Sequence, residues 1–375
     1  MRLVQLAAYD GPYPGSSVPM IHAALSEGRR RGWQVEAVFA ETARERPWLS
    51  LFRDDDIPVR IVERAARGTL ARQLEAMLAE RPAEPTILHT HFTVYDVPAV
   101  LASRRRAETA VFWHLHTPPE PRLSIRVRNR VKFSLFARGA AAILCVAPQI
   151  TEQVARMGAG DRARFFPNGI DTREFNRASP EVQQRARREL GSPEAAVLLG
   201  HFAWDWKVKG GDILLEALKR LRDMGLDVGA VMRASQLDLA RRDCERLGLG
   251  EAVTIIERLE RPQSMYDAVD VFVSSSRKEG MPFAVLEALL SGRPVVASDI
   301  PGHALVAADY PGCRIVPTDP AGMAEGLRAL LQEDPARLRA EVDRGASLIA
   351  ERMSLGGWTT RLFDLYAQVL PASGR

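Results

Sequence analysis

Apolar residues follow two patterns that alternate along this chain. Apolar, β-branched runs of strand length are separated by longer segments in which apolar residues recur at helical spacing. In the first half the strand-like runs are Leu3–Ala8, Gln34–Ala40, Thr86–His91, Ala110–Leu115, Ala141–Ala147 and Ala163–Phe166. The helix-like segments are Val18–Arg31, Thr69–Ala79, Val97–Arg105, Ser124–Ala137 and Gln149–Arg156. This β–α–β order predicts a parallel sheet with helices on both faces.

The same alternation restarts in the second half. After a polar, charged stretch at Asp171–Ser192, strand-like runs recur at Ala195–His201, Leu226–Met232, Ala252–Ile256, Val269–Ser274 and Pro294–Ser298. A length of 375 residues exceeds the usual single core. We therefore expect two Rossmann-like, doubly wound α/β domains, at residues 1–178 and 190–356. Apolar residues at helical spacing in Trp358–Leu370 predict a terminal helix.

Composition narrows the class of protein. The three cysteines, Cys145, Cys244 and Cys313, lack metal or redox spacing, which predicts reduced thiols and a cytoplasmic protein. The apolar run in Met1–Ala8 is too short for a signal peptide, and no segment has the roughly 18 uninterrupted apolar residues that a spanning helix requires. A net charge of +4 is too small in a chain of this length to indicate a nucleic-acid partner.

The strongest chemical signal lies in Ser274–Gly302. Glu279 is expected in a loop after a buried strand, and Glu287 about one and a half turns into a helix at Pro282–Leu290. The first N–H groups of such a helix have no partner within it, and the helix dipole favours a phosphate there. These are the N–H groups of Met281, Phe283 and Ala284. A carboxylate further along can accept hydrogen bonds from ribose hydroxyls. The alternative is an ordinary first-turn acid and a solvated helix residue.

The full string, E-G-x-P-x-x-x-x-E-A followed by S-G-x-P-V-V-A-S-D-x-P-G, resembles the donor-site signature of family 4 glycosyltransferases of the GT-B fold. The resemblance implies two Rossmann-like domains facing across a cleft, with a C-terminal helix at 357–375 that crosses back to the N-terminal, acceptor-binding domain. It also implies that Glu279 contacts the donor sugar and that Glu287 holds the nucleotide ribose. The backbone of Gly280, Met281, Pro282, Phe283 and Ala284 would meet the donor diphosphate.

A second motif, Gly200–Asp212, ends a strand in a loop rich in lysine and glycine. Cations beside a helix start can stabilise the charge that develops on a leaving diphosphate, which makes Lys209 and Lys207 candidate catalytic residues. The alternative is a solvated loop followed by a helix that an aspartate caps. Members of the resembled family usually carry an arginine where this chain has His201. We therefore expect Lys207 to supply the missing positive charge.

Two further segments of the N-terminal half match the family in part. Gly15 and Ser16 follow the first strand, where relatives often have a double glycine that approaches a phosphate. A plain β-to-α turn with a serine cap is the alternative. Phe165–Phe175 resembles the P-N-G-[VI]-D-x-x-x-F turn that ends the N-terminal domain. Its role is interpreted as architectural, with no chemistry assigned to Asn168.

Four histidines, His89, His91, His114 and His116, fall on two expected strands. Histidines two residues apart on a strand point to one face and can bind a metal, but no carboxylate or cysteine follows at ligand spacing. The resembled family needs no bound metal, so we expect neither metal nor cofactor. His116 matches the strand end at which relatives place a histidine near the donor sugar, and it is a candidate catalytic residue.

A basic stretch, Arg122–Arg138, alternates arginines and one lysine with apolar residues. Residues 101–150 contain nine Lys or Arg against two Asp or Glu. A basic amphipathic helix can lie on an anionic membrane surface, and in the resembled family it often brings the enzyme to a lipid-linked acceptor. The alternative is a core helix whose charged face is solvated.

The resemblance thus implies a retaining, metal-independent hexosyltransferase. The expected donor is a nucleoside diphosphate sugar, most simply a UDP- or GDP-sugar, which is a co-substrate. The expected acceptor is a hydroxyl of a lipid-linked saccharide, a polysaccharide or a small natural product. The resemblance implies that the leaving phosphate takes the acceptor proton, so no protein nucleophile is needed. We expect a cytoplasmic enzyme, with peripheral association at the inner face of the membrane through 122–138. The alternatives are a GT-B phosphorylase or epimerase, and a non-catalytic module that binds nucleotide sugars or nucleic acid.

Overall fold

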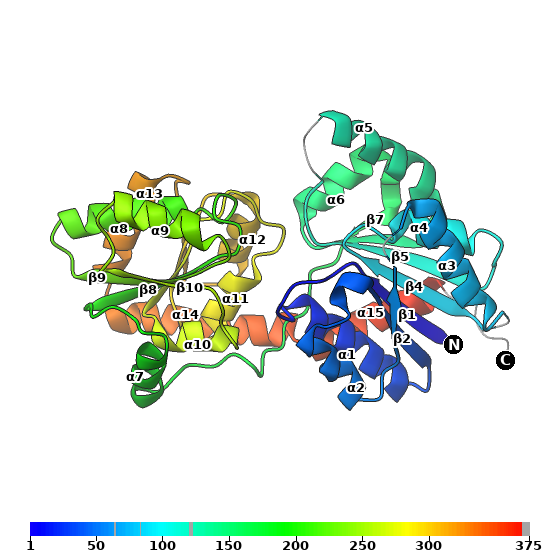
Figure 1. Cartoon of the computed structure of the whole chain (residues 1–375), viewed down its shortest axis with the longest axis horizontal. Coiled ribbons are helices and arrows are strands. Elements are labelled where there is room, and N and C mark those ends of the chain that lie inside the picture. Colours follow the sequence, from blue (N-terminus) through cyan, green and yellow to red (C-terminus); the bar gives the residue numbers. More distant parts are fainter. Residues whose placement is uncertain (64, 83, 120–122, 370–375) are drawn as a thin grey trace. The chain divides into compact units, whose positions relative to one another are not determined.

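The computed structural model describes residues 1–63, 65–82, 84–119 and 123–369 (Figure 1). The chain forms two compact units. Unit 1 contains Met1–Asp171 and the C-terminal residues from Leu355 on, and unit 2 contains Thr172–Ser354. Arg122, the first residue of the basic stretch, and residues 370–375 of the predicted terminal helix lie outside the described residues.

Unit 1 is built on a seven-stranded parallel sheet in the order β3-β2-β1-β4-β5-β6-β7. The strands are β1 (Arg2–Ala7), β2 (Gln34–Ala40), β3 (Val59–Val62), β4 (Thr86–His91), β5 (Thr109–Leu115), β6 (Ala142–Cys145) and β7 (Ala163–Phe165). The predicted strands are confirmed. The prediction missed β3 because it is a four-residue edge strand that is largely half-buried and contains an arginine.

One face of this sheet packs against α1 (Ser17–Arg30), α2 (Ser50–Asp54) and α15 (Leu355–Val369). The C-terminal helix α15 buries Trp358, Leu362, Phe363 and Tyr366 in this core, which confirms that the chain returns to its N-terminal domain. The other helices of unit 1 are α3 (Arg67–Ala79), α4 (Asp96–Ser103), α5 (Leu123–Val131) and α6 (Pro148–Val154). Helix α5 continues as a π-helix, η3 (Lys132–Phe136).

Unit 2 has a six-stranded parallel sheet in the order β10-β9-β8-β11-β12-β13. Its strands are β8 (Val197–Ala203), β9 (Val228–Ala234), β10 (Val253–Ile256), β11 (Val271–Ser274), β12 (Val295–Ser298) and β13 (Cys313–Val316). Its helices are α7 (Pro180–Glu189), α8 (Gly211–Asp223), α9 (Leu237–Arg246), α10 (Pro262–Ala268), α11 (Phe283–Leu290), α12 (Pro301–Asp309), α13 (Pro320–Leu331) and α14 (Pro335–Met353).

Helix α7 lies inside the polar stretch Asp171–Ser192, for which the sequence analysis predicts no helix. Ser179 caps it by accepting a hydrogen bond from the Val182 N–H, and Pro180 occupies its first position. Both are standard signals for a helix start. The prediction missed them because the helix is almost entirely polar, with only Ala186 buried.

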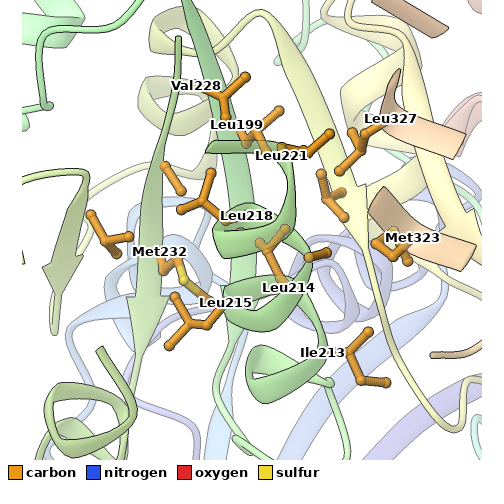
Figure 2. Close-up of a cluster of buried hydrophobic side chains, with 14 of the residues drawn as sticks. Leu199, Ile213, Leu214, Leu215, Leu218, Leu221, Val228, Met232, Met323 and Leu327 are labelled. Atoms are coloured by element: carbon orange, nitrogen blue, oxygen red, sulfur yellow. The ribbon is translucent and has the colours of Figure 1, made fainter. Parts of the chain in front are cut away.

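Apolar side chains of α8 pack against the sheet of unit 2 and against α13 (Figure 2). They are Leu214, Leu215, Leu218 and Leu221, and they pack in one cluster with Leu199, Val228 and Met232 of the strands and with Met323 and Leu327 of α13. Full burial of each such side chain contributes about 1.5–3 kcal/mol. The start of α8, with the loop before it, therefore rests on a rigid base.

All three cysteines are free, as predicted, and all three are buried. In the described part of the chain, no helix combines the length and apolar character that crossing a bilayer requires.

Candidate functional site

Each unit has a switch point, where strands on either side of the sheet centre are added in opposite directions. In unit 1 it lies between β1 and β4, and in unit 2 between β8 and β11. Open parallel sheets bind ligands outside the carboxyl ends of their strands at such points. The loops there carry most of the residues singled out from the sequence, namely 204–210 and 275–282 in unit 2, and 8–16 and 92–95 in unit 1.

Lys209 and Glu279 meet at the switch point of unit 2. The Lys209 ammonium lies 2.5 Å from Glu279 Oε1, and each side chain is only 14% exposed. Ser276 donates a hydrogen bond to the same oxygen at 2.7 Å. The ammonium also lies 4.9 Å from a ring centre of Trp204, within cation–π range. Two residues that are 70 positions apart thus form one charged centre.

Two tryptophans and a glycine shape the loop before α8. Trp206 is fully buried, and its indole N–H donates to Asp243 Oδ2 at 2.8 Å, whereas Trp204 is 54% exposed. Gly210 has a φ of 70°, and a Cβ at this position would lie 2.0 Å from the Ser275 carbonyl oxygen. Only glycine fits there. The loop is therefore a fixed support for Lys209.

Lys207 contacts Asp212 rather than Glu279. Its ammonium lies 2.8 Å from Asp212 Oδ2, and its side chain is 65% exposed. Arg277 donates to Asp212 Oδ1 at 2.9 Å and to the Lys207 carbonyl at 2.6 Å. Burial raises the pKa of the Asp212 carboxyl, but hydrogen bonds from Arg277 and Lys207 outweigh it, so this pKa is lowered overall. Sequence reasoning missed Arg277, although it lies two residues before Glu279 in the motif.

His201 occupies the position of the family's arginine and brings no charge there. It is 1% exposed, and its Nδ1–H donates to the Val273 carbonyl at 2.8 Å. Burial lowers its pKa to about 4, so the ring is neutral at pH 7. The charge lost with the arginine is therefore not restored at this position.

Helix α11 begins at Phe283, one residue later than predicted, with Pro282 as its N-cap. The Phe283 N–H donates to the Met281 carbonyl at 3.0 Å. This N–H thus has no partner within the helix, as predicted, but the preceding turn occupies it. Gly280, Met281 and Ala284 keep their predicted places around the helix start.

Glu287 is buried, which rules out the solvated alternative for this residue. It is 6% exposed, and the Tyr266 hydroxyl donates to its Oε2 at 2.8 Å. Burial and the neighbouring carboxylate raise the pKa of Tyr266 well above its usual value, so this hydroxyl stays a donor. Sequence reasoning missed Tyr266 because it lies on α10, 21 residues before Glu287, with no local pattern that links the two.

The four histidines form a column of rings at the switch point of unit 1. His89, His91 and His114 are 0% exposed, and His116 is partly exposed at the strand end. Neighbouring ring centres lie between 4.4 and 5.4 Å apart. Burial lowers the pKa of all four, that of His116 to about 3, so the column is uncharged at pH 7.

Three of these histidines could supply the three nitrogen ligands of a metal site. Nitrogens of His89, His91 and His114 all lie within 4.8 Å of one another. Zinc requires about 2.0–2.1 Å to each nitrogen, with lone pairs that converge on the ion. The ring planes are instead nearly parallel, 22° apart for His89 and His91 and 15° apart for His89 and His114. This arrangement favours ring stacking over metal ligation.

The loop after β1 is held by aromatic contacts. Tyr9 packs on Trp48 with ring centres 5.8 Å apart, and the Trp48 indole N–H donates to the Gly11 carbonyl at 2.9 Å. Gly15, with a φ of 50°, and Ser16, the N-cap residue of α1, complete the turn. These two residues therefore lie beside the carboxyl end of β1, where the sequence predicts them.

The loop after β4 is strained. Phe92 and Thr93 both have left-handed backbones, with φ of 61° and 64°. Such residues cost on the order of 1–3 kcal/mol each and cluster at functional sites. Phe92 stacks on His116, with ring centres 4.9 Å apart and planes 28° apart. The strained turn thus covers one face of the candidate catalytic histidine.

The segment formed by α5 and η3 exposes an apolar stripe. Val127, Val131 and Leu135, spaced four residues apart, are 59%, 48% and 62% exposed. Lys132 is buried instead, where its ammonium lies 2.5 Å from the fully buried Asp96. This ion pair ties the segment to the core and leaves the stripe to solvent, with the exposed Arg126, Arg128 and Arg130 around it.

Family models match most of both units. The model described as Glycosyltransferase Family 4 matches residues 20–174, and the model described as Glycosyl transferases group 1 matches residues 194–333.

Curated proteins similar to this chain include two named D-inositol 3-phosphate glycosyltransferase. The Corynebacterium urealyticum protein is 31% identical over 220 residues, which are 55% of this chain and 51% of that protein. The Saccharomonospora viridis protein is 27% identical over 396 residues, 92% of this chain and 87% of that protein. The match thus spans about half of the first relative and most of the second.

Solved structures share the whole fold. Anabaena HepE, in complex with UDP and glucose, has a TM-score of 0.82 at 19% identity and covers 98% of this chain and 100% of its own. A glycosyltransferase from Rickettsia africae has a TM-score of 0.82 at 14% identity and covers 99% of both chains. At these identities the likeness shows the fold alone.

Proposed function

Because this chain belongs to the family 4 glycosyltransferases of the GT-B fold, we propose that it transfers a hexosyl group from a nucleoside diphosphate sugar to a hydroxyl acceptor. One observation carries the proposal. Lys209 and Glu279 form a single charged centre at the carboxyl ends of the unit 2 strands, with Glu287 held by Tyr266 on the helix that follows. These groups complement a diphosphate, the sugar hydroxyls and a ribose diol.

Lys209 is the proposed counter-ion of the leaving diphosphate. A fixed cation in a water-poor site stabilises the charge that moves onto the diphosphate as the glycosidic bond breaks. Glu279 pairs with Lys209 and balances its charge. In the proposed complex, the diphosphate forms an ion pair with the Lys209 ammonium, and Glu279 accepts hydrogen bonds from sugar hydroxyls. Lys207, held by Asp212, is the second proposed cation.

The start of α11 and the loop after β1 are the proposed contacts of the donor phosphates. The backbone from Gly280 to Ala284 surrounds a helix start, where the dipole favours an anion. Gly15 and Ser16 offer a similar turn before α1. We propose UDP as the nucleotide, with GDP as the second candidate, because Anabaena HepE was solved with UDP and with UDP-glucose.

The proposed chemistry retains the anomeric configuration. A bond forms between the acceptor oxygen and the anomeric carbon while the bond from that carbon to the β-phosphate oxygen breaks. The acceptor proton passes to the departing phosphate oxygen, so the protein supplies no nucleophile, metal or cofactor. The protein contributes orientation and electrostatic stabilisation. In unit 1, His116 is the residue that we propose to contact the reacting substrate.

A screen of nucleotide sugars tests the function. We expect one of the UDP, GDP, ADP or TDP sugars to raise the melting temperature, because ligand at 100 times its Kd stabilises the fold by about 2.7 kcal/mol. The same sugar should then release its nucleoside diphosphate, with an α-linked donor giving an α-linked product by NMR. Tight binding without release would instead indicate a binding module. Cleavage that depends on inorganic phosphate would indicate a phosphorylase.

We propose that the enzyme meets its acceptor at a membrane surface. The apolar stripe of Val127, Val131 and Leu135 is flanked by arginines that form no ion pair with a described residue. Such a surface suits the anionic inner face of the cytoplasmic membrane, where each Lys or Arg near the surface contributes about 1 kcal/mol. Cytoplasmic location with peripheral attachment, and a lipid-linked saccharide as acceptor, follow from this proposal.

Liposome flotation tests the membrane contact. The unaltered protein should float with vesicles that contain anionic lipid and stay in solution with neutral ones. Val131→Glu combined with Leu135→Glu should abolish flotation, because both side chains belong to the stripe. Met224→Glu is the control, since Met224 is an exposed apolar residue of unit 2. Flotation that ignores lipid charge would contradict the proposal.

A further inference from the structure

The charged centre of unit 2 is assembled from two loops. Loop 204–210 carries Lys209, and loop 275–282 carries Glu279. The Ser275 hydroxyl of the second loop lies 2.8 Å from the Gly210 carbonyl oxygen and 3.3 Å from that of Lys209 in the first loop. The two loops are therefore joined by more than the ion pair between their charged side chains.

Arg277 of the second loop binds the backbone before Lys209 and the side chain after it. Its own backbone N–H donates to the Val208 carbonyl at 2.8 Å, and its guanidinium donates to the Lys207 carbonyl at 2.6 Å. The same guanidinium donates to both carboxylate oxygens of Asp212, at 2.9 and 3.1 Å. A two-oxygen contact of a planar guanidinium fixes direction as well as distance. Arg277 thus holds the segment around Lys209 at both of its ends.

The contacts of Arg277 do not depend on the pairing of Lys209 with Glu279. In the proposed complex the Lys209 ammonium binds the diphosphate, so its ion pair no longer joins the two loops. A lysine side chain is a flexible four-carbon stem, and the place of its ammonium depends on how firmly its backbone is held. The bonds from Arg277 supply that support in both states.

Lys207 shares Asp212 with Arg277 but cannot take over this role. Its ammonium reaches one oxygen of the carboxylate, Oδ2 at 2.8 Å, and its side chain is 65% exposed, where ion pairs are weak. It also belongs to the same loop as Lys209, so its contact with Asp212 does not join the two loops.

We propose that Arg277 is a positioning residue that holds Lys209 at the leaving diphosphate, by binding the chain on both sides of it. Both hydrogens of Arg277 Nη1 already have protein acceptors, namely the Lys207 carbonyl and Asp212 Oδ1, which favours this role over a direct contact with phosphate. The inference rests on the proposed function and deepens it, because Arg277 lies outside the donor-site signature that begins at Glu279.

A double-mutant cycle separates positioning from direct contact. Arg277→Met should lower kcat for release of the nucleoside diphosphate about tenfold, because hydrogen bonds of a charged group are lost. In a Lys209→Ala background the same change should lower kcat less than about threefold, since two residues that act as a unit are not additive. An Arg277 that touches phosphate, or that only stabilises the fold, would lower kcat equally in both backgrounds and would overturn the proposal.

Two further variants accompany the cycle. Arg277→Lys keeps the charge without the planar fork, and it should lose less kcat than Arg277→Met and remain folded where the latter does not. Arg328→Met is the matched control, because Arg328 makes a similar two-oxygen contact with Glu325 on α13. It should leave kcat unchanged.

Hydrogen exchange reads the position of the loop without any substrate. The Lys209 N–H donates to the Asp205 carbonyl and the Gly211 N–H to the Trp206 carbonyl, so both amides are bonded within the loop. Peptides that span residues 205–211 should exchange faster in Arg277→Met, and to a smaller extent in Arg277→Lys, because the loop opens more often without its support. The control variant should exchange as the unaltered protein does.

The two proposals fail separately. If no nucleotide sugar is turned over but exchange in 205–211 rises in the Arg277 variants alone, the proposed function fails and the support of the loop by Arg277 stands. If the enzyme is active and neither Arg277 variant changes exchange or kcat, the present inference alone is overturned.

Discussion

The switch points of the two units are electrostatic opposites. In unit 2, Lys209 and Glu279 are charged and paired, and a second set of charges, Lys207, Asp212 and Arg277, lies beside them. In unit 1, strand β4 at the switch point and its neighbour β5 carry a column of neutral histidines. The same architecture thus carries paired charges in one unit and neutral rings in the other. On the proposed function, the first suits a diphosphate and the second suits a hydroxyl.

Removing the central cation of unit 2 should have the largest effect. Lys209→Ala is expected to lower kcat for release of the nucleoside diphosphate by about 100-fold or more, because a preorganised charge at the leaving group is lost. Lys207→Ala should cost less, since its side chain is mostly exposed and contacts Asp212. Rates of diphosphate release measure both. Unchanged kinetics in both variants would eliminate the leaving-group site.

Tyr266→Phe removes the hydroxyl that positions Glu287. Hydrogen bonds to charged groups contribute about 1.5–3 kcal/mol, so KM for the donor should rise roughly tenfold or more with a smaller change in kcat. Initial rates over a range of donor concentrations separate the two parameters. Tyr95→Phe, at a tyrosine of unit 1 that is 1% exposed, is the control. An equal loss of kcat and kcat/KM would argue against a role in donor binding.

Acid should destabilise unit 1 before unit 2. A histidine whose pKa is about 3 in the fold, as for His116, against about 6.5 when unfolded binds fewer protons in the native state. Its contribution to stability is complete above pH 6.5 and is lost at about 1.4 kcal/mol per pH unit as the pH falls toward the folded pKa. Unit 1 has four such histidines, whereas the pKa is lowered in unit 2 at His201 and His303.

Hydrogen exchange at pH 7, 5 and 4 resolves this acid effect by unit. After correction for intrinsic rates, amides of β4 and β5 should lose protection first. Earlier loss in β8 and β11 would contradict the electrostatic contrast between the units.

Replacing Trp204 should have a smaller effect on donor binding, because Trp204 acts through its contact with Lys209. A cation–π contact contributes about 0.5–2 kcal/mol, so Trp204→Leu should raise the donor KM by roughly threefold to tenfold, while Trp204→Phe, which keeps an aromatic face, should lose less. Val208→Ala, at an exposed position of the same loop, should leave KM unchanged. Equal KM values for the Leu and Phe variants would show that the aromatic face is irrelevant.

Removing metal ions with a chelator is expected to have the smallest effect on activity and stability. Because the rings of His89, His91 and His114 stack instead of converging, dialysis against EDTA should alter neither activity nor melting temperature. Elemental analysis of the purified protein provides an independent check. A stoichiometric metal whose removal lowers the melting temperature would refute the stacked interpretation.

Most of the fold, and the part of the candidate site that lies in unit 2, could be predicted from the sequence. Strand-like runs and helical spacing are local patterns, so both parallel sheets were predicted. The strands β3 and β13 were missed because each is a four-residue edge strand that contains an arginine, and α7 was missed because it is almost entirely polar. Lys209 and Glu279 were found through a family signature. The contact of Tyr266 with Glu287 was not predicted, because it joins side chains of two different helices that only the tertiary structure brings together.

The return of α15 sets an order of events during synthesis. Tyr366 contacts Gln5 across 361 positions, so the core of unit 1 cannot close until α15 has been synthesised. Unit 2, whose residues are continuous, is complete earlier. Domains usually fold in the order in which they are made, N-terminal first. Here the second unit can finish before the first, and the part of the first sheet that α15 covers stays exposed until that helix has been made.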